Sequence, residues 1–149
     1  MNDKYFMNQA IALAKEAAEE GEVPVGAVVV LDGKIVGAGR NRREISKNAL
    51  AHAEIEAINE ACRALGGWRL WQCDMYVTLE PCPMCTGAII NSRMKRLVYG
   101  ASDYKAGSCG SVIDLFSLPY NHKPEVAKGV MQEECAALLT DFFKKLRKK

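Results

Sequence analysis

The sequence predicts an α/β protein, a three-layer α/β/α sandwich around a mixed five-stranded sheet. Two neighbouring apolar runs are separated by Asp32-Gly33, a dipeptide typical of a two-residue β-hairpin turn. Beyond this hairpin, strand-like apolar segments alternate with helix-like ones along the rest of the chain. A hairpin followed by β-α-β alternation gives a sheet with antiparallel and parallel neighbours and with helices on both faces.

Length and composition indicate a single domain over residues 1–149, with no internal repeat, linker or biased segment. Hydrophobic residues make up 49% and charged residues 26% of the chain, which is typical of a globular protein and excludes a disordered or fibrous one. The longest stretch without Asp, Glu, Lys or Arg, residues 81–92, is shorter than the roughly 20 residues that a membrane helix needs. The first residues lack the basic and apolar regions of a secretory signal, so we expect a cytoplasmic protein with no membrane partner.

The N-terminal part of the chain predicts one helix and the hairpin. Apolar residues recur at helical spacing over residues 3–20, and Gly21 follows as a helix C-cap. Residues 25–31 are almost continuously apolar, as in a strand that is covered on both faces. Asp32-Gly33 then turns the chain into a second strand, residues 34–38, which should pair with the first in antiparallel.

The remaining segments predict the strands and helices that complete the sandwich. Residues 40–50 are polar and loop-like, and residues 51–65 have the spacing of a helix that ends at Gly66-Gly67. A closing helix carries an apolar stripe that starts at Cys135 and ends at Leu146. The segments between these two helices are expected in the order strand 75–79, helix 84–91, strand 97–99, a loop with Gly107 and Gly110, and strand 125–130.

Basic charge is concentrated at the C-terminal end, where five of the last six residues are Lys or Arg. Such a cluster can bind phosphates, but Lys and Arg also stabilise the C-terminal end of a helix through its dipole. On charge alone we favour a solvated helix end. The five residues are Lys144, Lys145, Arg147, Lys148 and Lys149.

Two short motifs carry the candidate chemistry, His52-Ala53-Glu54 and Glu80-Pro81-Cys82-Pro83-Met84-Cys85. The Cys-x-x-Cys spacing lets both thiolates reach one metal ion, and a position at a helix start favours the thiolate over the thiol. Zinc is the natural metal, because it accepts sulfur and imidazole ligands in tetrahedral geometry. In a chain without a secretory signal, six cysteines indicate thiols or a metal site rather than disulfides.

The number of candidate ligands predicts a catalytic zinc. His52, Cys82 and Cys85 make three ligands, and the chain has one further histidine, His122, and no second Cys-x-x-Cys. A structural zinc normally has four protein ligands, whereas a catalytic zinc keeps one position for water or substrate. Residues two apart do not share a helix face, so Glu54 and His52 can reach one pocket only from the first turn of their helix.

These residues would perform a hydrolytic deamination. Zinc lowers the pKa of a bound water towards neutrality and thereby supplies a hydroxide nucleophile. Glu54, which is not a ligand, can take the proton of that water, deliver it to a ring nitrogen of the substrate and help to protonate the departing amine.

Each residue also has a simpler interpretation. A lone Cys-x-x-Cys fits a thioredoxin-like redox pair, but such a pair needs no carboxylate beside an imidazole. Alone, His52 would be a helix cap or a surface residue, and Glu54 a partner of the helix dipole. The two motifs together favour the catalytic zinc site. Three cysteines that lie among apolar residues are expected in the core, and Cys109, in a glycine loop, has no predicted role; the three are Cys62, Cys73 and Cys135.

The pattern H-x-E…P-C-x-x-C is the signature of zinc nucleobase deaminases, and the whole sequence closely resembles the bacterial tRNA-specific adenosine deaminases of the TadA type. The zinc motif alone indicates only the deaminase superfamily. The Gly-Ala-x-Asp loop and the closing Ala-Leu-Leu-x-x-Phe-Phe helix indicate the tRNA branch. The resembling segments are Val23–Ala27, Arg40–Arg42, Ala51–Glu54, Thr78–Cys85, Gly100–Asp103, Tyr120–His122 and Glu134–Leu139.

The resemblance implies a cytidine deaminase-like fold, a homodimer and the deamination of adenosine to inosine at the wobble position of a tRNA anticodon loop. It implies zinc held by His52, Cys82 and Cys85, with zinc-bound hydroxide attacking C6 and Glu54 as proton shuttle. The implied partner is the anticodon stem-loop of tRNA, and no DNA is expected. Residues that the resemblance places against the flipped nucleotide, the pocket or the RNA groove are Asn41, Val23, Ala53, Asp103 and Phe143.

A tRNA substrate gives the basic residues a role as phosphate contacts, both in the tail and at Arg40, Arg42 and Arg43. His122 stays open between an RNA contact, a structural hydrogen-bonding residue and a fourth zinc ligand. The alternative enzyme is a free nucleobase deaminase acting on guanine or cytosine, which would not need a phosphate-binding surface. The alternative outside enzymes is an RNA-binding protein with a structural zinc.

Overall fold

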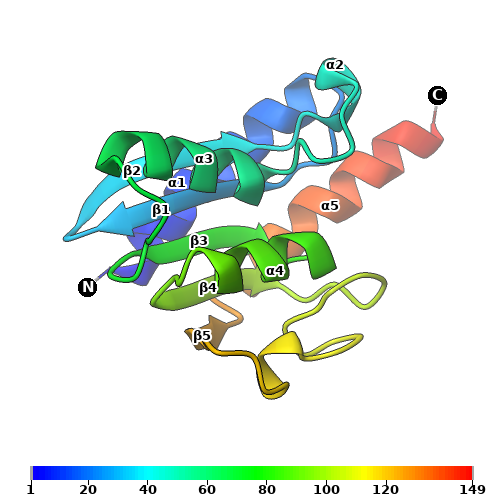
Figure 1. The fold of residues 1–149 in the computed structure, drawn as a ribbon. Helices are drawn as coiled ribbons and strands as arrows, with labels where there is room; N and C mark the ends of the chain where they lie inside the picture. The colour runs from blue at the N-terminus through cyan, green and yellow to red at the C-terminus, as the bar shows by residue number, and fades with distance from the viewer. Residues whose placement is uncertain (1, 149) are drawn as a thin grey trace.

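The computed structural model describes residues 2–148 and shows an α/β fold built on one sheet. Its elements, in chain order, are α1 (Asp3–Glu19), β1 (Gly26–Leu31), β2 (Lys34–Arg40), α2 (Arg43–Ser46), α3 (Ala53–Leu65), β3 (Asp74–Leu79), α4 (Pro83–Asn91), β4 (Arg96–Ala101), the 3₁₀ helix η1 (Leu115–Ser117), β5 (Glu125–Lys128) and α5 (Gln132–Arg147). The strands lie in the order β2-β1-β3-β4-β5 (Figure 1). β1 is antiparallel to β2 and β3, whereas β3, β4 and β5 run parallel.

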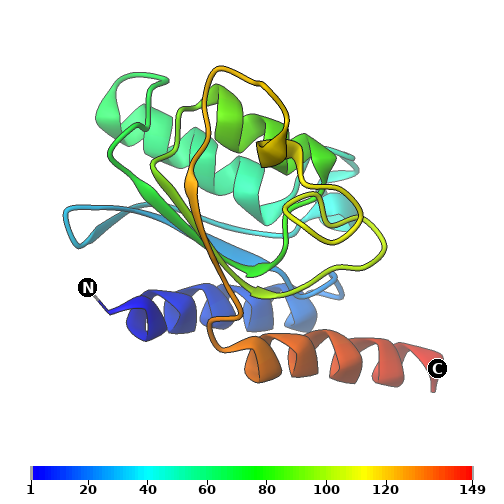
Figure 2. The ribbon, with the colours of Figure 1, turned by 90° about the horizontal axis from the view of Figure 1, so that it is seen from below.

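Helices cover both faces of this sheet. Figure 2 shows α1 and α5 side by side on one face, and α3 and α4 on the other. The expected three-layer α/β/α sandwich with a mixed five-stranded sheet is thereby confirmed.

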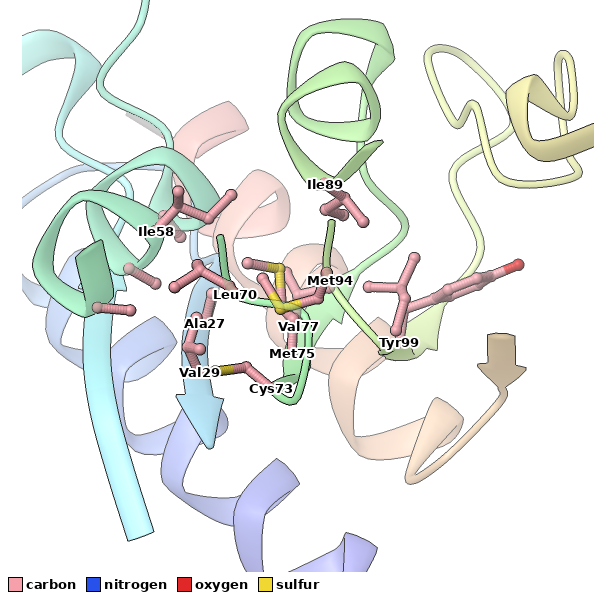
Figure 3. Packing of buried hydrophobic residues seen from close by; sticks show 14 of the residues in the cluster. Ala27, Val29, Ile58, Leu70, Cys73, Met75, Val77, Ile89, Met94 and Tyr99 are labelled. Atoms are coloured by element: carbon pink, nitrogen blue, oxygen red, sulfur yellow. The ribbon is translucent and has the colours of Figure 1, made fainter. Parts of the chain in front are cut away.

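Side chains of the central strands alternate between two layers of the core. Ala27, Val29 and Met75 pack in the cluster beneath α3 and α4 (Figure 3). Val28 and Tyr76 belong to the cluster against α1 and α5. Because successive residues of a strand point to opposite faces, a strand covered on both sides has to be apolar throughout. This explains the continuous apolar run that the sequence shows at β1.

The hairpin forms where Asp32-Gly33 predicts it, and it joins β1 to β2 in antiparallel. Asp32 and Gly33 both have positive φ, 50° and 77°, as a type I′ turn requires. Most other boundaries lie within one to three residues of their predicted places. The last strand is shorter than the predicted 125–130, because Gly129 takes a positive φ and ends it.

The prediction of a loop over residues 40–50 is wrong at its centre, where α2 forms. The Glu22 carboxylate, which lies 22 residues away along the chain, accepts hydrogen bonds from the backbone N–H groups of Glu44 (3.1 Å) and Ile45 (2.8 Å). A distant carboxylate therefore satisfies amides that a helix start leaves unpaired. No local signal in residues 40–50 announces this partner.

Gly39 of β2 lets the N-terminal end of α3 approach the sheet. A Cβ atom at this position would lie 2.7 Å from Glu56 Cβ and 2.8 Å from the backbone nitrogen of Ala57. We expect Gly39→Ala to lower the free energy of unfolding by about 2–3 kcal/mol, since the helix backbone cannot move aside without disturbing the layer beneath it. Urea unfolding followed by circular dichroism measures the change.

Gly67 provides the control for this substitution. A Cβ atom there would meet nothing within 4 Å. Gly67→Ala should therefore leave the free energy of unfolding within about 0.5 kcal/mol of the unsubstituted protein. Equal destabilisation by the two substitutions would contradict the packing role of Gly39.

All six cysteines are free of disulfide bonds. Cys73 and Cys135 are buried as expected, and Cys62 is half-buried against the α3 side of the core. Burial raises the pKa of Cys73 to about 11 and that of Cys135 to about 12, so both remain thiols at neutral pH. Among residues 2–148, no helix has the length and apolar character needed to cross a membrane.

Candidate metal and catalytic site

A cavity of about 510 Å³ opens at the carboxyl ends of β3 and β4, where the N-terminal ends of α3 and α4 also lie. In α/β proteins this edge of the sheet is the usual place for a ligand. The loop after β4 and the helix α5 complete its walls. Nearly all the candidate site residues line this cavity: Val23, Asn41, His52, Ala53, Glu54, Cys82, Asp103 and Phe143.

The three candidate metal ligands lie close together, and two of them, His52 and Cys82, line this cavity. His52 Nδ1 lies 3.7 Å from Cys82 Sγ and 3.6 Å from Cys85 Sγ. Tetrahedral zinc with Zn–S of about 2.3 Å and Zn–N of about 2.0–2.1 Å places its nitrogen and sulfur ligands about 3.6 Å apart. Within residues 2–148, His52, Cys82 and Cys85 are the metal-binding residue types whose ligand atoms are close enough to share an ion. Two sulfurs and one imidazole at this spacing fit zinc.

The start of α3 explains how His52 and Glu54 serve one site. His52 is the N-cap residue with extended backbone angles, and its side chain makes no capping hydrogen bond. Its ring is therefore free to point beyond the helix end towards the two cysteines. Glu54 stands in the first helical turn and lines the same cavity. The first-turn arrangement that the two-residue spacing requires is thus present.

The start of α4 supplies the two sulfurs. Cys82 is the N-cap residue, Pro83 takes the first helical position and Cys85 lies in the same turn. Proline suits this position because its missing N–H would have no partner there. A hydrogen bond from the Cys85 thiol, together with one from His52, lowers the pKa of Cys82 to about 4. The same hydrogen bond raises the pKa of the Cys85 thiol, so Cys82 ionises first.

Glu54 is a buried carboxyl group beside these thiols, only 4% exposed. Burial raises its pKa to about 7. A carboxyl group with a pKa near the working pH can both accept and donate a proton. A glutamate that only interacted with the helix dipole would not need to be buried in a cavity wall. The position of Glu54 therefore favours a role in the cavity.

The remaining histidine has a structural contact. His122 Nε2 lies 2.7 Å from the backbone oxygen of Met94, so the ring donates a hydrogen bond that ties the segment before β5 to the start of β4. His122 is not a member of the metal-ligating group. Of the three interpretations left open for this residue, the geometry supports the structural one.

The arginines before α3 differ in their surroundings. Arg40 makes an ion pair with Glu20 at 2.8 Å, and Arg42 lies 3.3 Å from a carboxylate oxygen of Glu56. Arg43 lines the cavity. Arg43 is therefore the one of the three that stands at the cavity itself. In the C-terminal cluster, Lys144, Lys145 and Arg147 occupy the last turn of α5, while Lys149 lies outside the described residues.

Several cavity residues carry no role in the sequence interpretation. Ser102, Tyr104, Lys105 and Ala106 follow β4 beside Asp103, and their loop has no local pattern that identifies it as a wall. Glu80 stands immediately before Pro81 in a motif that we singled out for its cysteines alone. Its position next to the ligand segment is the signal that could have marked it.

Comparisons with known proteins agree with this geometry. The family model of MafB19-like deaminases matches residues 1–147. A tRNA-specific adenosine deaminase of Bacillus subtilis (strain 168) is 49% identical over 99% of this chain and 92% of its own length.

Two solved structures share the fold. One comes from studies of A-to-I editing by tRNA:A34 deaminases at the wobble position of transfer RNA; it has a TM-score of 0.88 and 46% identity over 91% of this chain and 99% of that one. The other, a guanine deaminase from Bacillus subtilis, has a TM-score of 0.68 and 34% identity over 100% of this chain and 96% of that one.

Proposed function

This chain belongs to the family of tRNA-specific adenosine deaminases, and from that membership we propose that it converts adenosine to inosine at the wobble position of a tRNA anticodon loop. Water adds at C6 of the base and ammonia leaves. The observation that carries this proposal is the placement of Glu54 in the cavity that His52 and Cys82 also line, where Cys85 completes a group of zinc-ligating geometry.

His52, Cys82 and Cys85 would hold a zinc ion. A bound zinc ion would act as a Lewis acid and would make water a nucleophile at neutral pH. Three protein ligands leave a position for that water. A fourth protein ligand is not offered by His122, whose ring is engaged at Met94.

Glu54 would move the protons of the reaction. Its buried carboxylate accepts a proton from the attacking water and delivers it to a ring nitrogen of adenine, and it then helps to protonate the leaving amine. Burial supports this exchange, because it keeps the neutral and ionised forms of Glu54 close in free energy near pH 7.

The rest of the cavity would bind the nucleotide. Asn41 and Asp103 offer polar groups, whereas Val23, Ala53 and Phe143 offer apolar surface. A base taken out of an anticodon loop can stack on an aromatic ring and be recognised at its edges. The volume of the cavity lies within the range of about 300–1,000 Å³ that is usual for small-ligand sites.

A free nucleobase deaminase is the second candidate, favoured by the similarity to the guanine deaminase structure. Arg43 at the cavity and the basic end of α5 favour an RNA substrate, because a free base has no phosphate to contact.

The predicted homodimer and cytoplasmic location stay predictions, since the structure describes one chain.

The decisive experiment offers the purified protein an anticodon stem-loop with a wobble adenosine and, separately, free adenine, guanine and cytosine. We expect inosine in the stem-loop and no turnover of the bases. The same stem-loop with adenosine only at another loop position controls for specificity. Deaminated guanine or cytosine beside an unchanged stem-loop would establish the second candidate, and a stem-loop that is bound but never deaminated would indicate an RNA-binding protein.

A further inference from the structure

The loop over residues 102–111, here called the wall loop, lines the cavity with its residues 102–106 and is hydrogen-bonded to a buried carboxylate. We propose that Glu80 is a positioning residue: its side chain holds the wall loop at a fixed distance from the metal-ligand segment and thereby sets the shape of the substrate cavity. This inference rests on the proposed function for its consequence on substrate binding. Its structural basis is independent of which base is bound.

Four hydrogen bonds join Glu80 to this one loop. Oε1 accepts from the backbone N–H of Asp103 at 3.0 Å and from the hydroxyl of Ser111. Oε2 accepts from the backbone N–H groups of Cys109 at 3.0 Å and Ser111 at 3.1 Å. Glu80 is 2% exposed, and none of the ion pairs among residues 2–148 includes it. The wall loop thus supplies the polar partners that a buried carboxylate needs.

The dependence runs in both directions. Without Glu80, the amides of Asp103, Cys109 and Ser111 would lose their carboxylate acceptor. A glutamine has the same shape but only one acceptor oxygen. In either orientation of its side-chain amide, the NH₂ group would face a backbone N–H donor instead of an acceptor. Only a carboxylate satisfies all four donors, which explains why an acid stands at a position that contacts no basic group.

Backbone hydrogen bonds at Glu80 and Pro81 also connect this part of the chain to the metal-ligand segment. The N–H of Glu80 donates to the oxygen of Ala101 at 2.8 Å, and the oxygen of Pro81 accepts from the N–H of Ser108 at 2.9 Å. Cys82, a candidate zinc ligand, is the next residue. Ala101, which directly precedes the wall loop, and Ser108, which lies within it, are therefore fixed to the two residues before Cys82.

Gly107 shows how closely the loop wraps the carboxylate. A Cβ atom at this position would lie 2.6 Å from Glu80 Oε1, so only glycine leaves room for the group. On the cavity side, Asp103 Oδ1 accepts from the N–H groups of Lys105 (3.0 Å) and Ala106 (3.2 Å) and folds the loop tip on itself. The position of Asp103, a candidate substrate contact, thus follows from the position of Glu80.

Glu80→Gln tests the proposal through two readouts. Amide hydrogen exchange of the peptide that spans residues 102–111 should become at least about 10-fold faster, since hydrogen bonds to a charged group are being lost. With the stem-loop substrate, KM should rise about 10-fold and kcat should stay within about 3-fold, because the loop binds substrate and does not react. Zinc content should remain at the level of the unsubstituted protein.

Asp74→Asn is the matched control. Asp74 is a buried acid at the opposite end of β3, near Arg96 and away from the cavity. This substitution should leave both the exchange of residues 102–111 and KM unchanged. If Asp74→Asn and Glu80→Gln accelerate exchange in the wall loop equally, the proposal is overturned, because the effect would then be general destabilisation.

Ser111→Ala decides the question if Glu80→Gln does not fold. It removes one donor from Glu80 and leaves the backbone bonds in place. We expect exchange in the wall loop and KM each to rise about 2–3-fold, and unchanged exchange would overturn the proposal. A fall in kcat with unchanged KM for Glu80→Gln would also overturn it. Faster loop exchange in a protein that never deaminates the stem-loop would uphold the positioning role and refute the proposed function instead.

Discussion

Glu54→Gln is expected to lower kcat on the stem-loop by about 10²–10⁴-fold, the usual contribution of a positioned acid–base group. Glutamine has nearly the same size and can occupy the same buried place, but it cannot accept a proton from water or return one to the base. Fold and zinc content should therefore be retained, since Glu54 is not among the candidate ligands. Single-turnover formation of inosine, measured with zinc-loaded protein, gives the rate without interference from product release.

Glu60→Gln provides the comparison on the same helix. Glu60 lies on α3 as Glu54 does, but it is exposed and lies outside the cavity. Its substitution should leave kcat and KM unchanged. A Glu54→Gln protein that keeps kcat within a few-fold of the original would remove the carboxylate from the reaction and leave the proposed mechanism without a proton carrier.

Signals that lie within a few residues of one another predicted much of this molecule. Asp32-Gly33 specifies its turn through the backbone conformations that these two residues tolerate, and the Cys-x-x-Cys spacing brings two sulfurs together within one helical turn. The alternation of strand and helix patterns then predicts the three layers of the fold, because each pattern indicates which faces of its strand or helix must be buried.

Contacts between distant segments explain what the sequence did not reveal. α2 depends on the Glu22 carboxylate, and the wall loop depends on Glu80; in both cases the hydrogen-bond donors carry no pattern of their own. A backbone N–H is present at almost every residue. The local sequence therefore does not indicate which of these groups will donate to a distant side chain. Several residues that line the cavity were predicted from motifs and resemblance, whereas the role of Glu80 in placing its wall emerges only from the folded chain.

Removing the metal should have the largest effect of all. We expect His52→Ala to abolish zinc binding and to lower activity by more than about 10³-fold, because two cysteines alone cannot complete the ligand set and water would lose its activating cation. Chelation of the unsubstituted protein should have the same effect, and added zinc should restore activity there but not in His52→Ala. Metal content by mass spectrometry and inosine formation, measured on the same samples, check the result.

Thermal unfolding separates loss of the metal from loss of the fold. Zinc that binds the folded chain only, at 100 times its dissociation constant, contributes about 2.7 kcal/mol of stability, which corresponds to about 5–10 °C in Tm for a domain of this size. Zinc should therefore raise the Tm of the chelated protein and leave that of His52→Ala unchanged. Cys62→Ser, which alters a thiol away from the cavity, should retain zinc, activity and the zinc-dependent Tm. The chelated protein should remain folded, and full activity in that zinc-free state would show that the cation has no part in the reaction.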